Sequence, residues 1–200
     1  MNEFRATIAI VRRHIDRRFA IDWGMEFGIV AAIAYAFTLT FAHPLFPLAI
    51  ASVLAAASAA ERAHAETLRR VTFFAMPLYG RQLARAHAIA PALLALAIPL
   101  GYTLGAFART HVFPAQLFAA MLCSALVATL VALSATFRDG ARAWLYVVLA
   151  SFAGPLVALP FVLLGTHGLA LTYALGLITA FFALRAFGET LARYDPLPAL

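Results

Sequence analysis

Hydrophobic residues gather into six long runs, at residues 21–42, 44–60, 86–108, 112–136, 143–165 and 167–187. Each run is close to the roughly 20 residues that a helix needs to cross the hydrocarbon core of a bilayer. The connections between the runs contain no Ser/Gly-rich linker, and the sequence has no convincing internal repeat. The pattern predicts an all-α membrane protein, with six transmembrane helices in one domain that covers residues 1–200.

A second pattern precedes the first long run. Apolar residues recur every three or four positions in the segment 3–20, at Phe4, Ile8, Val11, Ile15 and Phe19. This spacing places them on one stripe of a helix, and the arginines lie largely off that stripe. We expect an amphipathic interfacial helix over residues 1–20, lying on the membrane surface. A cleaved signal peptide is the alternative, but the positive region is too long for one.

The composition agrees with a membrane location. Hydrophobic residues make up 64% of the chain, charged residues 12%, and the mean hydropathy is +0.89. All basic residues are arginine, so the chain lacks the lysine of a phosphate-binding P-loop. Any ATP-driven role therefore requires a separate ATPase. The single cysteine, Cys123, excludes a disulfide framework and is expected in the core.

The arginines are distributed unevenly between the two sides of the predicted bundle. Of the 15 arginines, only Arg109 falls in a connection on the side opposite to the termini. By the positive-inside rule, both termini and the segment 61–85 should be cytoplasmic. The net charge of +6 is thus a topology signal and does not indicate nucleic-acid binding. We expect a multi-pass protein of the bacterial inner membrane.

The segment 61–85 has features of a rigid corner. Glu66 lies four residues after Arg62 and three before Arg69, a spacing that supports a helix in water. The second span should therefore continue into the cytoplasm. Pro77 cannot continue that helix, so the chain should turn near residues 75–77 and start a new helix toward the third span.

This layout resembles the permease subunits of type-2 ATP-binding-cassette exporters. The resemblance is carried by Glu61, by Glu66-Thr67-Leu68 and by the stretch from Met76 to Leu83, although Tyr79-Gly80 departs from the usual small hydroxyl residue. It implies that residues 61–85 form a coupling segment that docks on the ATPase. The residues it assigns to coupling are Glu61, Glu66, Pro77, Leu78, Tyr79, Arg81, Gln82 and Arg85.

The resemblance also implies the partners. These are a separate ATPase subunit and a second permease subunit, identical or related, and no cofactor or metal is expected. Mildly polar spans suit export of an amphipathic or hydrophobic solute. Three alternatives stay open: a solvated loop that only fixes topology, a haem-exporter-like subunit, and a structural membrane subunit without its own transport path. The sequence contains no HExxH or GxSxG motif that would indicate a membrane enzyme.

Several residues within the spans are further candidates. Glu26 is expected to form a structural ion pair near the interface, with a transport carboxylate as the alternative. Pro91 and Pro99 should kink the third span, and Pro155 and Pro160 should form a kink or gate in the fifth. The Gly-xxx-Gly pair Gly101 and Gly105 allows close helix packing. Three outer histidines could bind a metal or stand apart: His43, His111 and His167.

Overall fold

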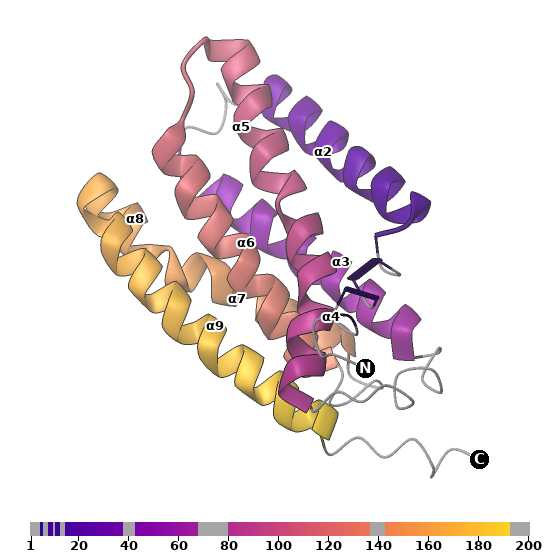
Figure 1. Ribbon diagram of the computed structural model, residues 1–200. Coiled ribbons are helices and arrows are strands. Elements are labelled where there is room, and N and C mark those ends of the chain that lie inside the picture. The colour runs from indigo at the N-terminus through magenta and orange to yellow at the C-terminus, as the bar shows by residue number, and fades with distance from the viewer. Residues whose placement is uncertain are drawn as a thin grey trace.

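The computed structural model describes residues 15–37, 43–67, 80–136 and 143–192, together with residues 5, 8, 9, 11 and 12. All regular elements in these ranges are helices, which pack as one bundle (Figure 1). The elements are α2 (Arg17–Phe37), α3 (Leu45–Thr67), α4 (Gly80–Ala95), α5 (Ala97–Thr110), α6 (Ala115–Thr136), α7 (Ala143–Val157), α8 (Leu159–Leu164), η3 (Gly165–Gly168) and α9 (Leu169–Ala192). The predicted all-α class is confirmed.

Several of these helices are long and apolar enough to cross a membrane. Five such segments occur in the described part of the chain: Arg17–Phe37, Leu45–Arg62, Ala84–Thr110, Ala115–Ala135 and Val147–Leu191. The length and the composition of these helices thus indicate a multi-pass membrane protein. The last segment is 45 residues long and contains α7, α8, η3 and α9, which fold back on themselves at Gly165–Gly168.

The helices run between two ends of the bundle. In Figure 1, the start of α2, the end of α3, the start of α4 and the end of α9 lie toward the lower right. The connection between α5 and α6 and the turn between α8 and α9 lie toward the upper left. The arginine-rich segments of the described chain therefore gather at one end.

The first long helix begins earlier than its apolar run. It starts at Arg17, four residues before the predicted start at Ile21. Ile15 and Asp16 form a bend, and the Asp16 carboxylate accepts a hydrogen bond from the backbone N–H of Phe19 at 2.8 Å. This is the arrangement of a helix N-cap. Most of the segment 1–14 lies outside the described residues, so the interfacial helix stays a prediction there.

The second long helix continues past its apolar part, as predicted. Its apolar stretch ends at Arg62, but α3 stays helical to Thr67. The next described helix, α4, starts at Gly80. The predicted corner at residues 75–77 lies outside the described residues.

The third span is broken between its two prolines. Helix α4 contains Pro91 and ends at Ala95, and α5 resumes after Leu96. Pro99 has no N–H to donate to the carbonyl four residues earlier, which explains the break. The Thr103 hydroxyl donates to the Pro99 carbonyl at 2.7 Å. The predicted kink is confirmed.

The fifth predicted span has the same construction. Pro155 lies inside α7, the helix breaks at Ala158, and Pro160 lies in the first turn of α8. The backbone N–H of Phe161 donates to the Thr172 hydroxyl of α9 at 3.2 Å. A side chain of the neighbouring helix thus satisfies a donor beside the break, as the membrane requires. The structure interrupts the helix between these two prolines, and the kink or gating role assigned to them stays a prediction.

Small residues bring the helices close together. Alanines make up most of the two large buried clusters, to which α2, α3, α4, α5, α6 and parts of α7, α8 and α9 contribute. Gly101 lies so close to α2 that an added Cβ would be 2.5 Å from the Phe27 carbonyl oxygen, and Gly105 meets Ala31 in the same way. The predicted close packing at this glycine pair is confirmed. Cys123 is also buried, as expected.

Candidate functional site

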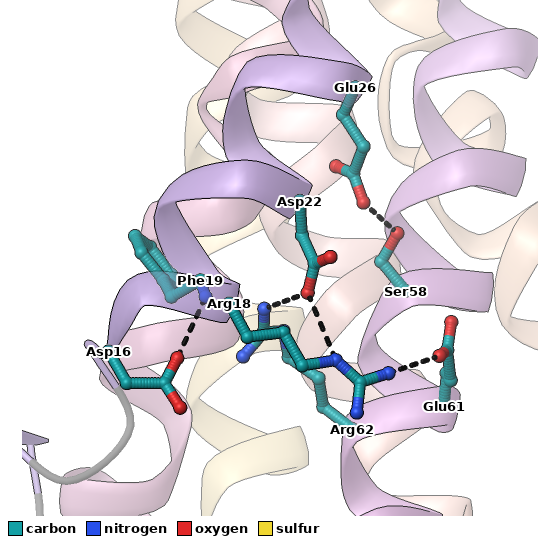
Figure 2. Close-up of polar contacts among 8 residues, drawn as sticks. All are labelled: Asp16, Arg18, Phe19, Asp22, Glu26, Ser58, Glu61 and Arg62. Atoms are coloured by element: carbon teal, nitrogen blue, oxygen red, sulfur yellow. Dashed lines mark hydrogen bonds and ion pairs between the residues drawn. The ribbon is translucent and has the colours of Figure 1, made fainter.

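Polar side chains link α2 and α3 near the arginine-rich end of the bundle (Figure 2). Asp22 and Glu26 lie one turn apart on α2, and Ser58 and Arg62 lie one turn apart on α3. The Arg62 guanidinium donates to Asp22 Oδ2 at 2.8 Å, and the Ser58 hydroxyl donates to Glu26 Oε1 at 2.5 Å. We call these four residues the α2–α3 polar seam.

Arg62 is well enclosed in the seam. Only 18% of its side chain is exposed, against 28% for Asp22. Its guanidinium carbon also lies 5.1 Å from the centre of the Phe19 ring, within cation–π range. The aromatic ring and the carboxylate replace part of the water that this cation would otherwise bind.

A second, more exposed pair lies outside the seam. Arg18 Nε is 3.9 Å from Asp22 Oδ2, and Arg18 NH2 is 3.5 Å from Glu61 Oε1. The Arg18 and Glu61 side chains are 72% and 76% exposed, so water screens this contact strongly. Asp22 is therefore reached by two arginines, one from each helix.

Glu26 differs from the expectation. The expected ion pair at this position is formed by Asp22 instead, and no ion pair to Glu26 occurs among the described residues. Glu26 Oε1 accepts from Ser58, while Oε2 is buried without a hydrogen-bond partner in the described chain. The expected ion pair of Glu26 is not formed because helix α3 presents the Ser58 hydroxyl, not a cation, to this carboxylate. One carboxylate oxygen of the α2–α3 polar seam therefore has no hydrogen-bond donor in the described chain.

The residues assigned to coupling lie around this end of the bundle. Glu61 lies on the exposed side of α3, and Glu66 lies in the last turn of that helix. Arg81, Gln82 and Arg85 lie in the first two turns of α4, where Arg85 is exposed and Gln82 is half-buried. The other residues of that set lie outside the described residues: Pro77, Leu78 and Tyr79. The structure therefore brings Glu61 next to α2, and it leaves Arg85 open to solvent.

Helix α4 is anchored directly after Arg85. Ala84, Ala86 and Ala88 are buried, and His87 is only 5% exposed. On α2, the Trp23 indole N–H donates to the Leu93 carbonyl of α4 at 3.2 Å. The start of α4 is thus packed into the bundle within about two turns.

The three histidines predicted for the outer loops lie in the described chain but do not form a metal site there. Among the described residues, no group of three or more His, Cys, Asp or Glu side chains could hold a metal ion. His43 accepts from the Leu45 backbone N–H at 3.3 Å, and His111 ends α5 in a left-handed conformation with φ 59°. Each histidine has its own place at a helix end.

Comparison with known proteins identified no relative of this chain. No protein-family model matches the chain, and neither a curated protein nor a solved structure matches it. The function must therefore be argued from this chain's own residues.

Proposed function

We propose that this chain is the transmembrane subunit of a type-2 ATP-binding-cassette exporter. In this proposal it works in the bacterial inner membrane with a separate ATPase subunit and a second permease subunit. ATP hydrolysis by the partner drives export of an amphipathic or hydrophobic solute.

The observation that carries the proposal is the pair of helices α3 and α4. Helix α3 continues beyond its apolar stretch to Thr67, and α4 begins at Gly80 before its own apolar stretch starts at Ala84. Both helices enter the bundle at its arginine-rich end (Figure 1). The proposed coupling segment 61–85 begins in the last turns of α3 and ends in the first turns of α4, so a push on it would move both helices.

Six crossings are part of the proposal. The segment Val147–Leu191 has 45 residues, which as one straight helix would extend about 68 Å, more than twice the roughly 30 Å of the hydrocarbon core. Its turn at Gly165–Gly168 supports two crossings, by α7–α8 and by α9. With the other four segments, this makes six crossings, an even number that puts both termini on one side of the membrane. In the proposal that side is the cytoplasm, where the positive-inside rule puts arginine-rich segments.

The second permease subunit has a candidate contact on α2. Gly24 and Gly28 have no atom within 4 Å of an added Cβ, in contrast to Gly101 and Gly105 of α5, which pack closely on α2. A second copy could approach this open side closely. The oligomeric state in a native-lipid nanodisc tests this part of the proposal.

Photo-crosslinking tests the coupling segment. A photoreactive amino acid at Arg85, exposed at the start of α4, should crosslink to a P-loop ATPase in native membranes. The matched control is Leu163 in α8, which is 71% exposed but lies at the other end of the bundle. A crosslink to the ATPase from Leu163 but not from Arg85 would contradict the proposal. A crosslink from neither position would favour the structural-subunit alternative.

A further inference from the structure

The α2–α3 polar seam contains more acceptors than its cations use. Asp22 and Glu26 lie four residues apart on α2, so their side chains project from the same face, about 5–6 Å apart at Cβ. Both face α3, as Figure 2 shows. Arg62 contacts Asp22, and the buried Oε2 of Glu26 has no partner in the described chain. A carboxylate oxygen without a donor at this depth is costly.

We propose that Arg62 is a two-position side chain that holds α3 on α2 through Asp22 in this state and through Glu26 in a second one. An arginine has a long, flexible stem and five N–H donors, and it stays charged in both positions. The Glu26 oxygen that lacks a donor here is the second acceptor. Ser58 occupies only the other oxygen of Glu26, so it does not block the move.

The Asp22 carboxylate has an arginine beside it in both positions. When Arg62 leaves Asp22, Arg18 is still 3.9 Å from the same carboxylate oxygen. Arg18 is 72% exposed and four residues before Asp22 on the same helix, so it can approach without movement of α3. Asp22 is therefore not left without a cation when Arg62 moves to Glu26.

The use of this switch rests on the proposed function. Arg62 lies where the apolar stretch of α3 ends, at the start of the proposed coupling segment 61–85. A shift from Asp22 to Glu26 would let α3 change its position along α2 while the two helices stay joined. The existence of the switch does not depend on the ATPase, so it can be tested on the purified protein alone.

A double-mutant cycle on thermal stability in nanodiscs tests the switch. The variants are Asp22→Asn, Glu26→Gln, the two combined, and Arg62→Met, with Glu61→Gln as the exposed control. If either carboxylate can receive Arg62, each single change lowers the Tm only slightly. The combined variant should lower the Tm by more than the sum of the two and approach the loss in Arg62→Met.

Two results would overturn the inference. One is a Tm loss in Asp22→Asn as large as in Arg62→Met, because Arg62 would then have no second acceptor. The other is additivity of the two carboxylate changes.

An experimental structure of the Asp22→Asn variant gives a second measurement. In that structure the Arg62 guanidinium should lie within about 3 Å of Glu26 Oε2. A guanidinium that stays beside the substituted side chain at position 22, or turns to solvent, contradicts the switch. Failure of ATPase binding would leave these results unchanged, so the switch and the proposed function can fail separately.

Discussion

The residue that best shows how the bundle tolerates its kinks is Thr172. Its side chain is fully buried on α9, and its hydroxyl accepts from the backbone N–H of Phe161, three residues after the break at Ala158. The Cys123 thiol donates to the Thr172 carbonyl at 3.6 Å. One residue of α9 thus contacts both α6 and α8, beside the turn at Gly165–Gly168.

Replacing Thr172 by valine should destabilise the protein. Valine has nearly the same shape but no oxygen, so the Phe161 N–H would lose its acceptor in an apolar environment. The expected loss is about 1–3 kcal/mol in the free energy of unfolding, measured by SDS titration in mixed micelles. Amide exchange at Phe161 should also become faster.

Thr179→Val is the matched control for that change. Thr179 lies two turns further along α9, is exposed, and donates only to the Leu175 carbonyl of its own helix. Its replacement should alter stability by no more than about 0.5 kcal/mol. Equal losses in the two variants would show that the hydroxyl of Thr172 does not stabilise the break.

At the scale of elements, two glycine pairs in α2 and α5 have different environments. Gly101 and Gly105 of α5 leave no room for a side chain against α2, whereas Gly24 and Gly28 of α2 face open space. The same sequence motif therefore has two environments within one pair of helices. Only the structure distinguishes them, because both pairs read identically in the sequence.

Gly105→Ile should destabilise the protein, whereas Gly24→Ile should leave its stability nearly unchanged. At Gly105 the added Cβ would overlap the Ala31 carbonyl oxygen and separate α5 from α2. We expect a loss of about 1–3 kcal/mol or more from overpacking. At Gly24 no atom lies within 4 Å, so folding should be preserved. Thermal unfolding in detergent measures both, and a larger loss at Gly24 would contradict this packing.

The sequence predicts the helices better than the contacts between them. Length and apolarity are properties of one segment, so the spans and the proline breaks follow from local pattern. The start of α2 at Arg17 does not follow from that pattern, because Asp16 fits the polar face of the preceding amphipathic segment equally well, although it caps α2. A cap depends on one side-chain hydrogen bond that hydropathy does not detect.

The polar seam escapes prediction for a related reason. In the sequence Arg18 and Arg62 read as topology signals and Asp22 carries no signal of its own, but the structure pairs them. Asp22 and Arg62 are 40 residues apart, and only the packing of α2 on α3 brings them together. The signal that could have indicated this pairing is that Asp22 and Arg62 carry opposite charges and lie at similar depth in neighbouring spans. Ser58 offered none.

At the scale of the whole molecule, the positions of the helix ends support the proposed orientation in the membrane. The starts of α2 and α4 and the ends of α3 and α9 gather at one end, where most arginines of the described chain lie (Figure 1). The positive-inside rule assigns such an end to the cytoplasm. The turn at Gly165–Gly168 lies at the opposite end and carries no arginine.

Cysteine labelling tests this orientation. In a Cys123→Ala background, Thr166→Cys in the exposed turn should react with a membrane-impermeant thiol reagent added to spheroplasts. Arg85→Cys should react only after the membrane is permeabilised. If Arg85→Cys were labelled from outside, the orientation would be reversed. If both positions reacted on the same side, the proposed six crossings would be wrong.

The most direct measurement for the central claim is the amount of P-loop ATPase that co-purifies with the chain from native membranes. The comparison is between the unchanged protein and Arg85→Glu, whose charge reversal lies in the exposed start of α4. We predict an ATPase in near-equal amount with the unchanged protein and its loss from Arg85→Glu at unchanged Tm. The absence of an ATPase from the unchanged protein, or its equal retention by Arg85→Glu, would contradict the coupling role of this segment.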